Sequence, residues 1–164
     1  MRVIVFSDSH GRLDYARRAL KEAGPVELLL HAGDFYRDAL ALAGASSLPV
    51  IAVTGNCDGA DAGPAEELFE LAGHKLLITH GHLNGGTRTG SLLHKAKEYG
   101  AEAVISGHTH ISQVITMDGI LFFNPGSISR PRDQDLPSYG LLEIEEESIA
   151  PSIRRLTSAG KPPS

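Results

Sequence analysis

The first half of the chain alternates short apolar runs with segments in which apolar residues recur at helical spacing. Residues 2–6 form a β-branched run that predicts a strand. Apolar positions over residues 12–23 recur every three or four residues, which predicts an amphipathic helix. The pattern repeats and predicts a strand at 26–30, a weaker helix at 37–43 and a strand at 50–53. Apolar strands separated by helices are typical of a sheet covered on both faces, so we expect a buried, largely parallel sheet here.

The second half of the chain is richer in strands. Two runs separated by a glycine turn predict a hairpin of residues 67–71 and 75–79, and a helix is predicted over residues 89–98. Further strands are predicted at 103–105, 112–117, 120–123, 139–145 and 149–156. We therefore expect one domain over residues 1–157 that holds two sheets covered by helices. The composition of residues 158–164 predicts a loose C-terminal tail.

Composition excludes several classes of protein. The 164-residue chain has a net charge of −5, 5% aromatic residues and no tryptophan. Strong nucleic-acid binding needs a basic face and aromatic stacking platforms, so we do not expect it. No apolar stretch approaches the roughly 20 residues of a membrane span, and the run at residues 3–6 is too short for a signal peptide. Cys57 is the only cysteine, which excludes an internal disulfide. We therefore expect a cytoplasmic protein with no membrane partner.

Seven side chains of the kinds that bind metal ions follow the predicted strands. They are Asp8 and His10 after the first strand, then Asp34, Asn56 and His80, and finally His108 and His110. Successive groups are 22 to 28 residues apart, which is enough for one or two further elements before the chain returns to the same edge. Functional groups in open α/β sheets gather at the carboxyl ends of the strands. The spacing therefore predicts a two-metal hydrolytic site built on strand ends.

Each group taken alone has a simpler explanation. Asp8 would cap a helix, and Gly33-Asp34 and Gly55-Asn56 are common turn sequences. The pair His108 and His110 is harder to explain by packing, because glycine and threonine accompany it after a strand. It is the recurrence of such groups at five strand ends that favours a metal site.

The ordered motifs resemble those of the calcineurin-like metallophosphoesterase superfamily. They are Asp8-Ser9-His10-Gly11, Gly33-Asp34, Gly55-Asn56-Cys57-Asp58, Thr79-His80-Gly81-His82 and Gly107-His108-Thr109-His110. The segment Asn124-Pro125-Gly126-Ser127, followed by Pro131-Arg132, is similar to the small YfcE-like phosphodiesterase branch. The resemblance implies an α/β (α+β) fold with four αββα layers, in which helices flank two mixed β-sheets and the metal site lies at the carboxyl ends of the strands.

The resemblance also implies a division of the ligands between two divalent ions. One ion would be held by Asp8, His10 and His110, the other by Asn56, His80 and His108, and Asp34 would bridge them. Asp34, Asn56 and His80 would thereby be part of the catalytic centre. The implied reaction is an in-line attack on phosphorus by a hydroxide that bridges the two metals, which expels an alcohol.

The donor set favours particular metals. Imidazole, amide and carboxylate ligands without thiolate suit borderline ions, so we expect Mn²⁺ first, with Zn²⁺, Ni²⁺, Fe or Co as alternatives. Mg²⁺ suits the site less well because it prefers oxygen ligands.

Several further residues are candidates for supporting roles. Asp58 would either orient a ligand histidine or help to protonate the leaving group. His82 would contact substrate or support a ligand, with direct metal binding as the alternative. Arg132 matches the Pro-Arg pair of the resembling proteins and would hold a phosphate with two hydrogen bonds. Arg88 and Arg130 are further candidates for this role, and the alternative for each is a solvated arginine.

The expected function is hydrolysis of a small-molecule phosphodiester. One alternative is a non-catalytic scaffold, like the retromer subunit that resembles this superfamily, and others are a phosphomonoesterase and a nuclease. Many phosphomonoesterases of the superfamily have a histidine directly after the ligand asparagine, where it helps the leaving group depart. This chain has Cys57 at that position, which argues against fast cleavage of alkyl monoesters. The sequence leaves open the natural substrate and whether the protein forms a homo-oligomer.

Overall fold

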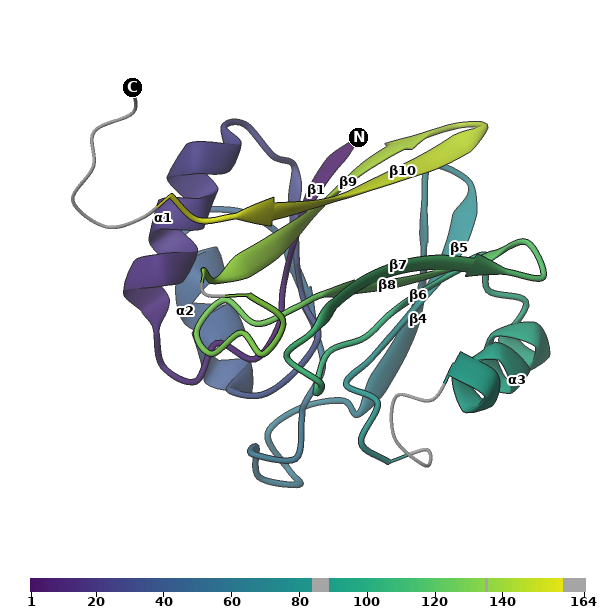
Figure 1. The fold of residues 1–164 in the computed structure, drawn as a ribbon, viewed down its shortest axis with the longest axis horizontal. Helices are drawn as coiled ribbons and strands as arrows, with labels where there is room; N and C mark the ends of the chain where they lie inside the picture. The colour runs from purple at the N-terminus through teal and green to yellow at the C-terminus, as the bar shows by residue number, and fades with distance from the viewer. Residues whose placement is uncertain (84–88, 135, 158–164) are drawn as a thin grey trace.

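The computed structural model describes residues 1–83, 89–134 and 136–157, which form ten strands and three helices (Figure 1). The strands are β1 (Arg2–Phe6), β2 (Leu28–His31), β3 (Val50–Ala52), β4 (Glu66–Leu71), β5 (His74–Thr79), β6 (Ala103–Ile105), β7 (Ser112–Met117), β8 (Ile120–Pro125), β9 (Ser138–Glu145) and β10 (Ser148–Arg155). The helices are α1 (Leu13–Ala23), α2 (Tyr36–Ser46) and α3 (Thr89–Tyr99). The predicted tail at residues 158–164 lies outside the described residues.

The first sheet has the strand order β10-β9-β1-β2-β3. The strands β1, β2 and β3 are parallel, because α1 and α2 return the chain to the same end of the sheet each time. The strands β9 and β10 form an antiparallel hairpin, and β9 pairs with β1. The carboxyl ends of β1, β2 and β3 consequently meet at one edge.

The second sheet has the strand order β4-β5-β6-β8-β7. Its three central strands β5, β6 and β8 are parallel, and the outer strands β4 and β7 pair antiparallel with their neighbours. The ends of β5 and β6 lead toward the edge at which β1 ends. There the Gly107 backbone N–H donates to the His80 carbonyl at 3.3 Å, and the Ile128 N–H donates to the Ser7 carbonyl at the same distance.

Three hydrophobic layers hold the sheets and helices together. Val3 and Val5 of β1 face the second sheet, in a core that also contains Phe123. The alternate residues Ile4 and Phe6 face α1 and α2 on the other side, as the two-residue period of a strand requires. A third core lies between the second sheet and α3. Burial of one such side chain contributes roughly 1.5–3 kcal/mol to the stability of the folded protein. Figure 1 shows α1 and α2 on one outer side and α3 on the other.

The predicted fold class is confirmed, because two mixed sheets lie between helices in four layers. The bounds of some elements differ from the expectation. The strand predicted at 26–30 begins at Leu28, which is the first residue that pairs with β1, and it extends to His31, which pairs with both Phe6 and Ala52. The second helix is longer than the predicted range 37–43, since it begins at Tyr36 and its last residues, 44–46, are exposed to solvent.

Candidate metal centre

Most of the predicted ligands occupy strained backbone conformations in the loops that follow the strands. Five of the seven have a positive φ, namely Asp8 (53°), His10 (45°), Asp34 (59°), His108 (71°) and His110 (60°). A left-handed conformation costs a residue with a side chain roughly 1–2 kcal/mol. Such strain persists only where surrounding contacts hold it, and it concentrates at functional sites. Here it turns side chains from separate loops toward one point.

Hydrogen bonds fix Asp8 so that one carboxylate oxygen is left facing the site. Its backbone carbonyl accepts hydrogen bonds from the hydroxyls of Ser127 (2.9 Å) and Ser129 (2.7 Å). Its Oδ2 accepts from the Ser7 hydroxyl (2.7 Å) and the His108 backbone N–H (3.0 Å). Its Oδ1 is buried and has no hydrogen-bond partner among the described residues.

One group of donors surrounds this free oxygen. The ligand atoms of Asp8, His10, Asp34 and His110 all lie within 4.8 Å of one another. His110 Nε2 is 3.3 Å from Asp8 Oδ1, and His10 Nε2 is 3.5 Å from Asp34 Oδ2. His110 Nδ1 donates to the Arg130 carbonyl at 2.7 Å, which leaves Nε2 to face the carboxylate. A backbone contact of this kind is how proteins orient histidines that bind metals.

A second group lies on the other side of Asp34. Asn56 Oδ1 is 3.1 Å from His80 Nε2 and 3.0 Å from His108 Nδ1. His80 Nδ1 donates to the Ala32 carbonyl at 2.7 Å, so its Nε2 faces Asn56 and also lies 3.4 Å from Asp34 Oδ1. Asp34 therefore presents one carboxylate oxygen to each group of donors.

The pKa values of the side chains in both groups are shifted, because carboxylates and imidazoles lie close together there. Burial acts to raise the pKa of Asp34, but hydrogen bonds from His80 and the Cys57 backbone N–H hold it well below its ordinary value. Burial acts to lower the pKa of His80, and the Asp34 and Asp8 carboxylates outweigh it, so the net shift is upward. The Asp8 carboxylate raises the pKa of His110. Burial lowers the pKa of His10.

These contacts fit divalent cations. A neutral His80 would direct its Nε2 lone pair at oxygen atoms of Asn56 and Asp34, a repulsive arrangement that a cation relieves. His10 Nε2, like Asp8 Oδ1, is buried without a hydrogen-bond partner among the described residues. Buried polar atoms of this kind are rare in folded proteins and call for an explanation. Two carboxylates, one amide and four imidazoles are a donor set for borderline metals such as Mn, Fe, Co, Ni and Zn.

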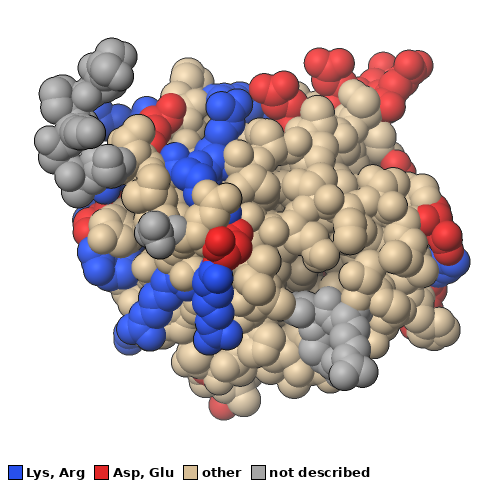
Figure 2. All heavy atoms as spheres, viewed as in Figure 1, with Lys and Arg blue, Asp and Glu red and all other residues tan. Residues whose placement is uncertain are grey.

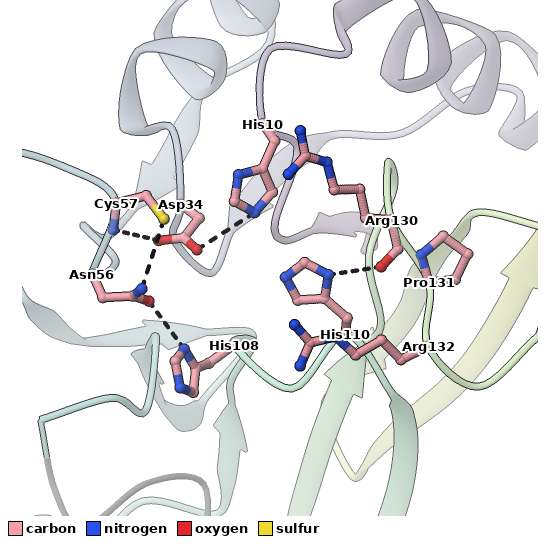
Figure 3. Close-up of a pocket in the computed structure, with 9 residues that line it drawn as sticks. All are labelled: His10, Asp34, Asn56, Cys57, His108, His110, Arg130, Pro131 and Arg132. Atoms are coloured by element: carbon pink, nitrogen blue, oxygen red, sulfur yellow. Dashed lines mark hydrogen bonds and ion pairs between the residues drawn. The ribbon is translucent and has the colours of Figure 1, made fainter.

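A cavity of about 410 Å³ opens over the two groups (Figure 3). It is lined by His10, Asp34, Asn56, Cys57, His108, His110, Arg130, Pro131 and Arg132. Figure 3 shows Asn56 and Cys57 on one side and the segment from Arg130 to Arg132 on the other. Of the three arginines named from the sequence, Arg130 and Arg132 line the cavity, and Arg88 lies outside the described residues.

The supporting candidates lie close to the site in different ways. Asp58 accepts hydrogen bonds from the backbone N–H groups of Tyr36 (2.8 Å) and Gly55 (2.9 Å), so it joins two segments. It forms no hydrogen bond or ion pair with a histidine among the described residues. The His82 ring lies 5.3 Å from the His80 ring, and its buried Nδ1 has no hydrogen-bond partner in the described part of the chain. His82 does not line the cavity.

A hydrogen-bond network behind the site was not anticipated from the sequence. Asp38, in the first turn of α2, accepts from the Ser9 hydroxyl (2.7 Å) and from the Gly11 backbone N–H (2.8 Å). Ser9 Oγ also lies 2.9 Å from Nε2 of the fully buried His31. The network fixes both ends of the loop that carries His10. The sequence signal was weak, since an acidic residue in the first turn of a helix is common.

Comparison with known proteins agrees with this geometry. Residues 1–147 match the calcineurin-like phosphoesterase superfamily domain. A probable metallophosphoesterase of Bacillus subtilis, YsnB, is 35% identical over 162 residues, which cover 98% of this chain and 93% of that protein. The phosphodiesterase YfcE of Escherichia coli K12 is 32% identical over 109 residues, which are 61% of this chain and 55% of YfcE.

A solved structure extends the agreement to the fold. The crystal structure of a predicted phosphoesterase from Streptococcus pneumoniae has a TM-score of 0.78 and 30% sequence identity, and covers 97% of this chain and 93% of that one. The family match spans most of the chain, and the strand-end motifs occur along it in order. The chain therefore belongs to the calcineurin-like phosphoesterase superfamily, in which its relatives include proteins named metallophosphoesterase and YfcE phosphodiesterase.

Proposed function

We propose that this protein is a metal-dependent phosphodiesterase with two divalent ions. The observation that carries the proposal is the position of Asp34, whose Oδ2 faces His10 and whose Oδ1 faces His80. One cation would be held by Asp8, His10 and His110, the other by Asn56, His80 and His108, with Asp34 shared. Mn²⁺ is the expected metal for this mixture of oxygen and nitrogen donors.

The side chains of the protein prepare the site for an anionic ester. When bound, the cations would supply positive charge to the phosphoryl oxygens and lower the pKa of a coordinated water molecule. Asp8 and Asp34 are the only carboxylates among the proposed ligands, so a loaded site has surplus positive charge and attracts a phosphate. The strained loops hold the ligands in place before the substrate arrives, which reduces the reorganisation that the reaction requires.

The relative named phosphodiesterase YfcE supports a phosphodiester substrate, and the residues that line the cavity argue against esters with strongly basic leaving groups, alkyl phosphomonoesters among them. Cys57 occupies the cavity wall next to Asn56, and burial followed by the Asp34 charge raises the pKa of its thiol. Such a thiol is a poor proton donor for a strongly basic leaving group. The scaffold alternative is disfavoured because the ligand atoms of Asp8, His10, Asp34 and His110 lie within 4.8 Å of one another, and two of them have no hydrogen-bond partner among the described residues.

Substitution of the shared and terminal ligands tests the proposal. The variants Asp34→Asn and His108→Ala are expected to reduce Mn²⁺-dependent hydrolysis of bis(p-nitrophenyl) phosphate by at least about a thousandfold, because each removes a ligand whose loss disrupts the site. Initial rates at several Mn²⁺ concentrations measure the effect, and p-nitrophenyl phosphate serves as the monoester comparison.

Matched controls exist at exposed positions. Asp61→Asn and His94→Ala make the same chemical changes at exposed residues that do not line the cavity, and both should retain full activity. Full activity in Asp34→Asn or His108→Ala would contradict the ligand assignment. A lack of turnover by the wild-type protein with Mn²⁺, Zn²⁺, Ni²⁺, Fe²⁺ and Co²⁺ would favour the scaffold alternative.

A further inference from the structure

Two arginines on the cavity wall carry charge that the protein itself does not balance. Arg130 and Arg132 line the cavity, and neither guanidinium forms an ion pair or hydrogen bond with a described residue. By contrast, Arg12, Arg18 and Arg155 are each paired with a carboxylate. Unpaired arginines whose forks face one cavity are suited to a phosphate or carboxylate on a ligand.

The two guanidiniums stand beside the proposed metal ligands. Figure 3 shows Arg130 reaching toward His10 and Arg132 toward His110. The Arg132 backbone N–H donates to the His110 carbonyl at 2.9 Å, so the segment with both arginines is tied to a ligand loop.

Charge balance indicates what these arginines would bind. The net charge of two divalent cations with the carboxylates of Asp8 and Asp34 would already exceed the single negative charge of a simple phosphodiester. The two arginines add positive charge at the cavity wall, away from Asn56 and Cys57. A simple diester leaves that charge uncompensated, whereas a substrate with a second phosphate next to the first compensates it.

The requirements of the leaving group indicate the same class of substrate. Apart from the proposed metal ligands, the ionisable side chains that line the cavity are Cys57, Arg130 and Arg132. None of these is a carboxylic acid or an imidazole, the side chains that most often protonate a departing alkoxide, and a guanidinium stays protonated at neutral pH. A leaving group in this cavity must therefore be a weak base, and a phosphate held by arginines meets that requirement where an alkoxide does not.

Room for an organic group is present next to Cys57. A second hollow of about 330 Å³ shares Cys57 with the cavity and is lined by Phe35, Tyr36 and Leu40, among others. Leu40 is 52% exposed, so this hollow offers apolar surface to a ligand. The two hollows share Cys57, so an organic group on a ligand bound beside the proposed metal ligands has apolar surface next to it.

We infer that the substrate is a pyrophosphate-linked diester, with one phosphate at the proposed metal ligands and the second phosphate on Arg130 and Arg132. The inference rests on the proposed function. In the reaction, a new P–O bond forms from the water oxygen to the first phosphate, and the bond from that phosphate to the bridging oxygen breaks. The products are two phosphate monoesters. One hydrogen of the water goes to each, and solvent removes these protons according to pH.

The test compares a double arginine variant on two substrates. With Mn²⁺-loaded protein, Arg130→Ala/Arg132→Ala should lower kcat/KM for P1,P2-di(adenosine-5′) diphosphate about a hundredfold, because two charge-assisted contacts are lost. The same variant should lower kcat/KM for bis(p-nitrophenyl) phosphate less than about tenfold, since that diester has no second phosphate. Arg154→Ala, an exposed arginine on β10 outside the cavity, should change neither value.

Binding gives a readout that does not depend on turnover. Isothermal titration calorimetry measures binding of adenosine 5′-(α,β-methylene)diphosphate to each protein. The wild type should bind this compound at least about tenfold more tightly than the double variant does, and Arg154→Ala should match the wild type. Arg130→Lys/Arg132→Lys should recover only part of the affinity, because lysine lacks the guanidinium fork.

The outcomes separate the inference from the proposed function. Equal losses on both substrates, or faster cleavage of adenylyl-(3′→5′)-adenosine than of the diphosphate by the wild type, would overturn the inference and leave the phosphodiesterase intact. If the wild type hydrolyses none of these esters with any of the metals tested above, both the proposed function and the inference are wrong.

Discussion

His31 illustrates how a single buried residue contributes to the site without facing it. The Gly33 backbone N–H donates to His31 Nδ1 at 3.3 Å, so the ring proton is on Nε2 and is donated to Ser9 Oγ. The Ser9 hydroxyl in turn donates to Asp38. This chain of donors requires a neutral imidazole, and burial lowers the pKa of His31 to about 4.

The neutral state of His31 predicts a pH dependence of stability. The unfolded chain binds a proton at His31 near pH 6.5, whereas the folded protein binds it only near pH 4. The free energy of unfolding should therefore fall as the pH drops from 6.5 to 4, by on the order of 3 kcal/mol. Urea unfolding at pH 7.5, 6, 5 and 4.5 measures this change.

A variant separates His31 from the other titrating groups. His31→Gln removes the titration, so its loss of stability relative to the wild type should be largest at pH 7.5 and should shrink as the pH falls to 4.5. If the free energies of unfolding of the two proteins differ by the same amount at every pH in this range, His31 does not titrate as described.

At the scale of elements, glycines at the strand ends let neighbouring loops approach one another. A side chain at Gly55 would collide with Asp34 Oδ1 and the Asp34 backbone nitrogen, and one at Gly107 would collide with Ser7 Oγ. A side chain at Gly33 would meet the His80 ring. The three loops can thus converge because these positions lack a Cβ atom.

Gly55→Ala tests the role of this close approach. The added methyl group should displace Asp34, destabilise the protein by roughly 1–3 kcal/mol and lower Mn²⁺-dependent activity about tenfold or more. Gly59→Ala is the matched control in the same loop, because nothing lies within 4 Å of a Cβ atom there. Urea unfolding and kcat/KM for bis(p-nitrophenyl) phosphate measure both effects. Equal free energies of unfolding and equal kcat/KM values for the two variants would contradict the role given to Gly55.

At the scale of the whole molecule, the site joins the two sheets. Asp8, Asp34 and Asn56 follow strands of the first sheet, whereas His80 and His108 follow strands of the second.

Basic side chains group on the face over α1 and the loop between β8 and β9, and acidic side chains gather near the turn between β9 and β10 (Figure 2). Each of the three helices in the described part of the chain has 11 residues, short of the roughly 20 apolar residues that a membrane span requires.

Metal binding between the sheets should stabilise the fold. Mn²⁺ at about 100 times its dissociation constant should raise the free energy of unfolding by roughly 2.7 kcal/mol, because it binds the folded chain alone. Thermal unfolding of EDTA-treated protein, with and without added Mn²⁺, measures the effect as a rise in Tm. Asp34→Asn should show a much smaller rise. An equal rise in that variant, or none in the wild type, would contradict a metal site that contains Asp34.

Much of this protein follows from its sequence. The alternation of apolar runs and helical periods predicts the order of the elements and the two sheets, because these signals depend on residues close together in the chain. The same local patterns put Asp8, Asp34, Asn56, His80 and His108 at strand ends. The strand ends of parallel neighbours must meet, so the convergence of candidate ligands was also predictable.

Other features depend on the tertiary structure alone. Which oxygen of Asp34 faces which histidine, the anchoring of Asp8 by Ser127, and the approach of Arg130 and Arg132 to the site all join residues far apart in the chain. Local propensity carries no information about such distances or orientations. They arise only when the two sheets pack and the left-handed loop residues turn their side chains toward the shared edge, because packing and long-range hydrogen bonds then outweigh local preference.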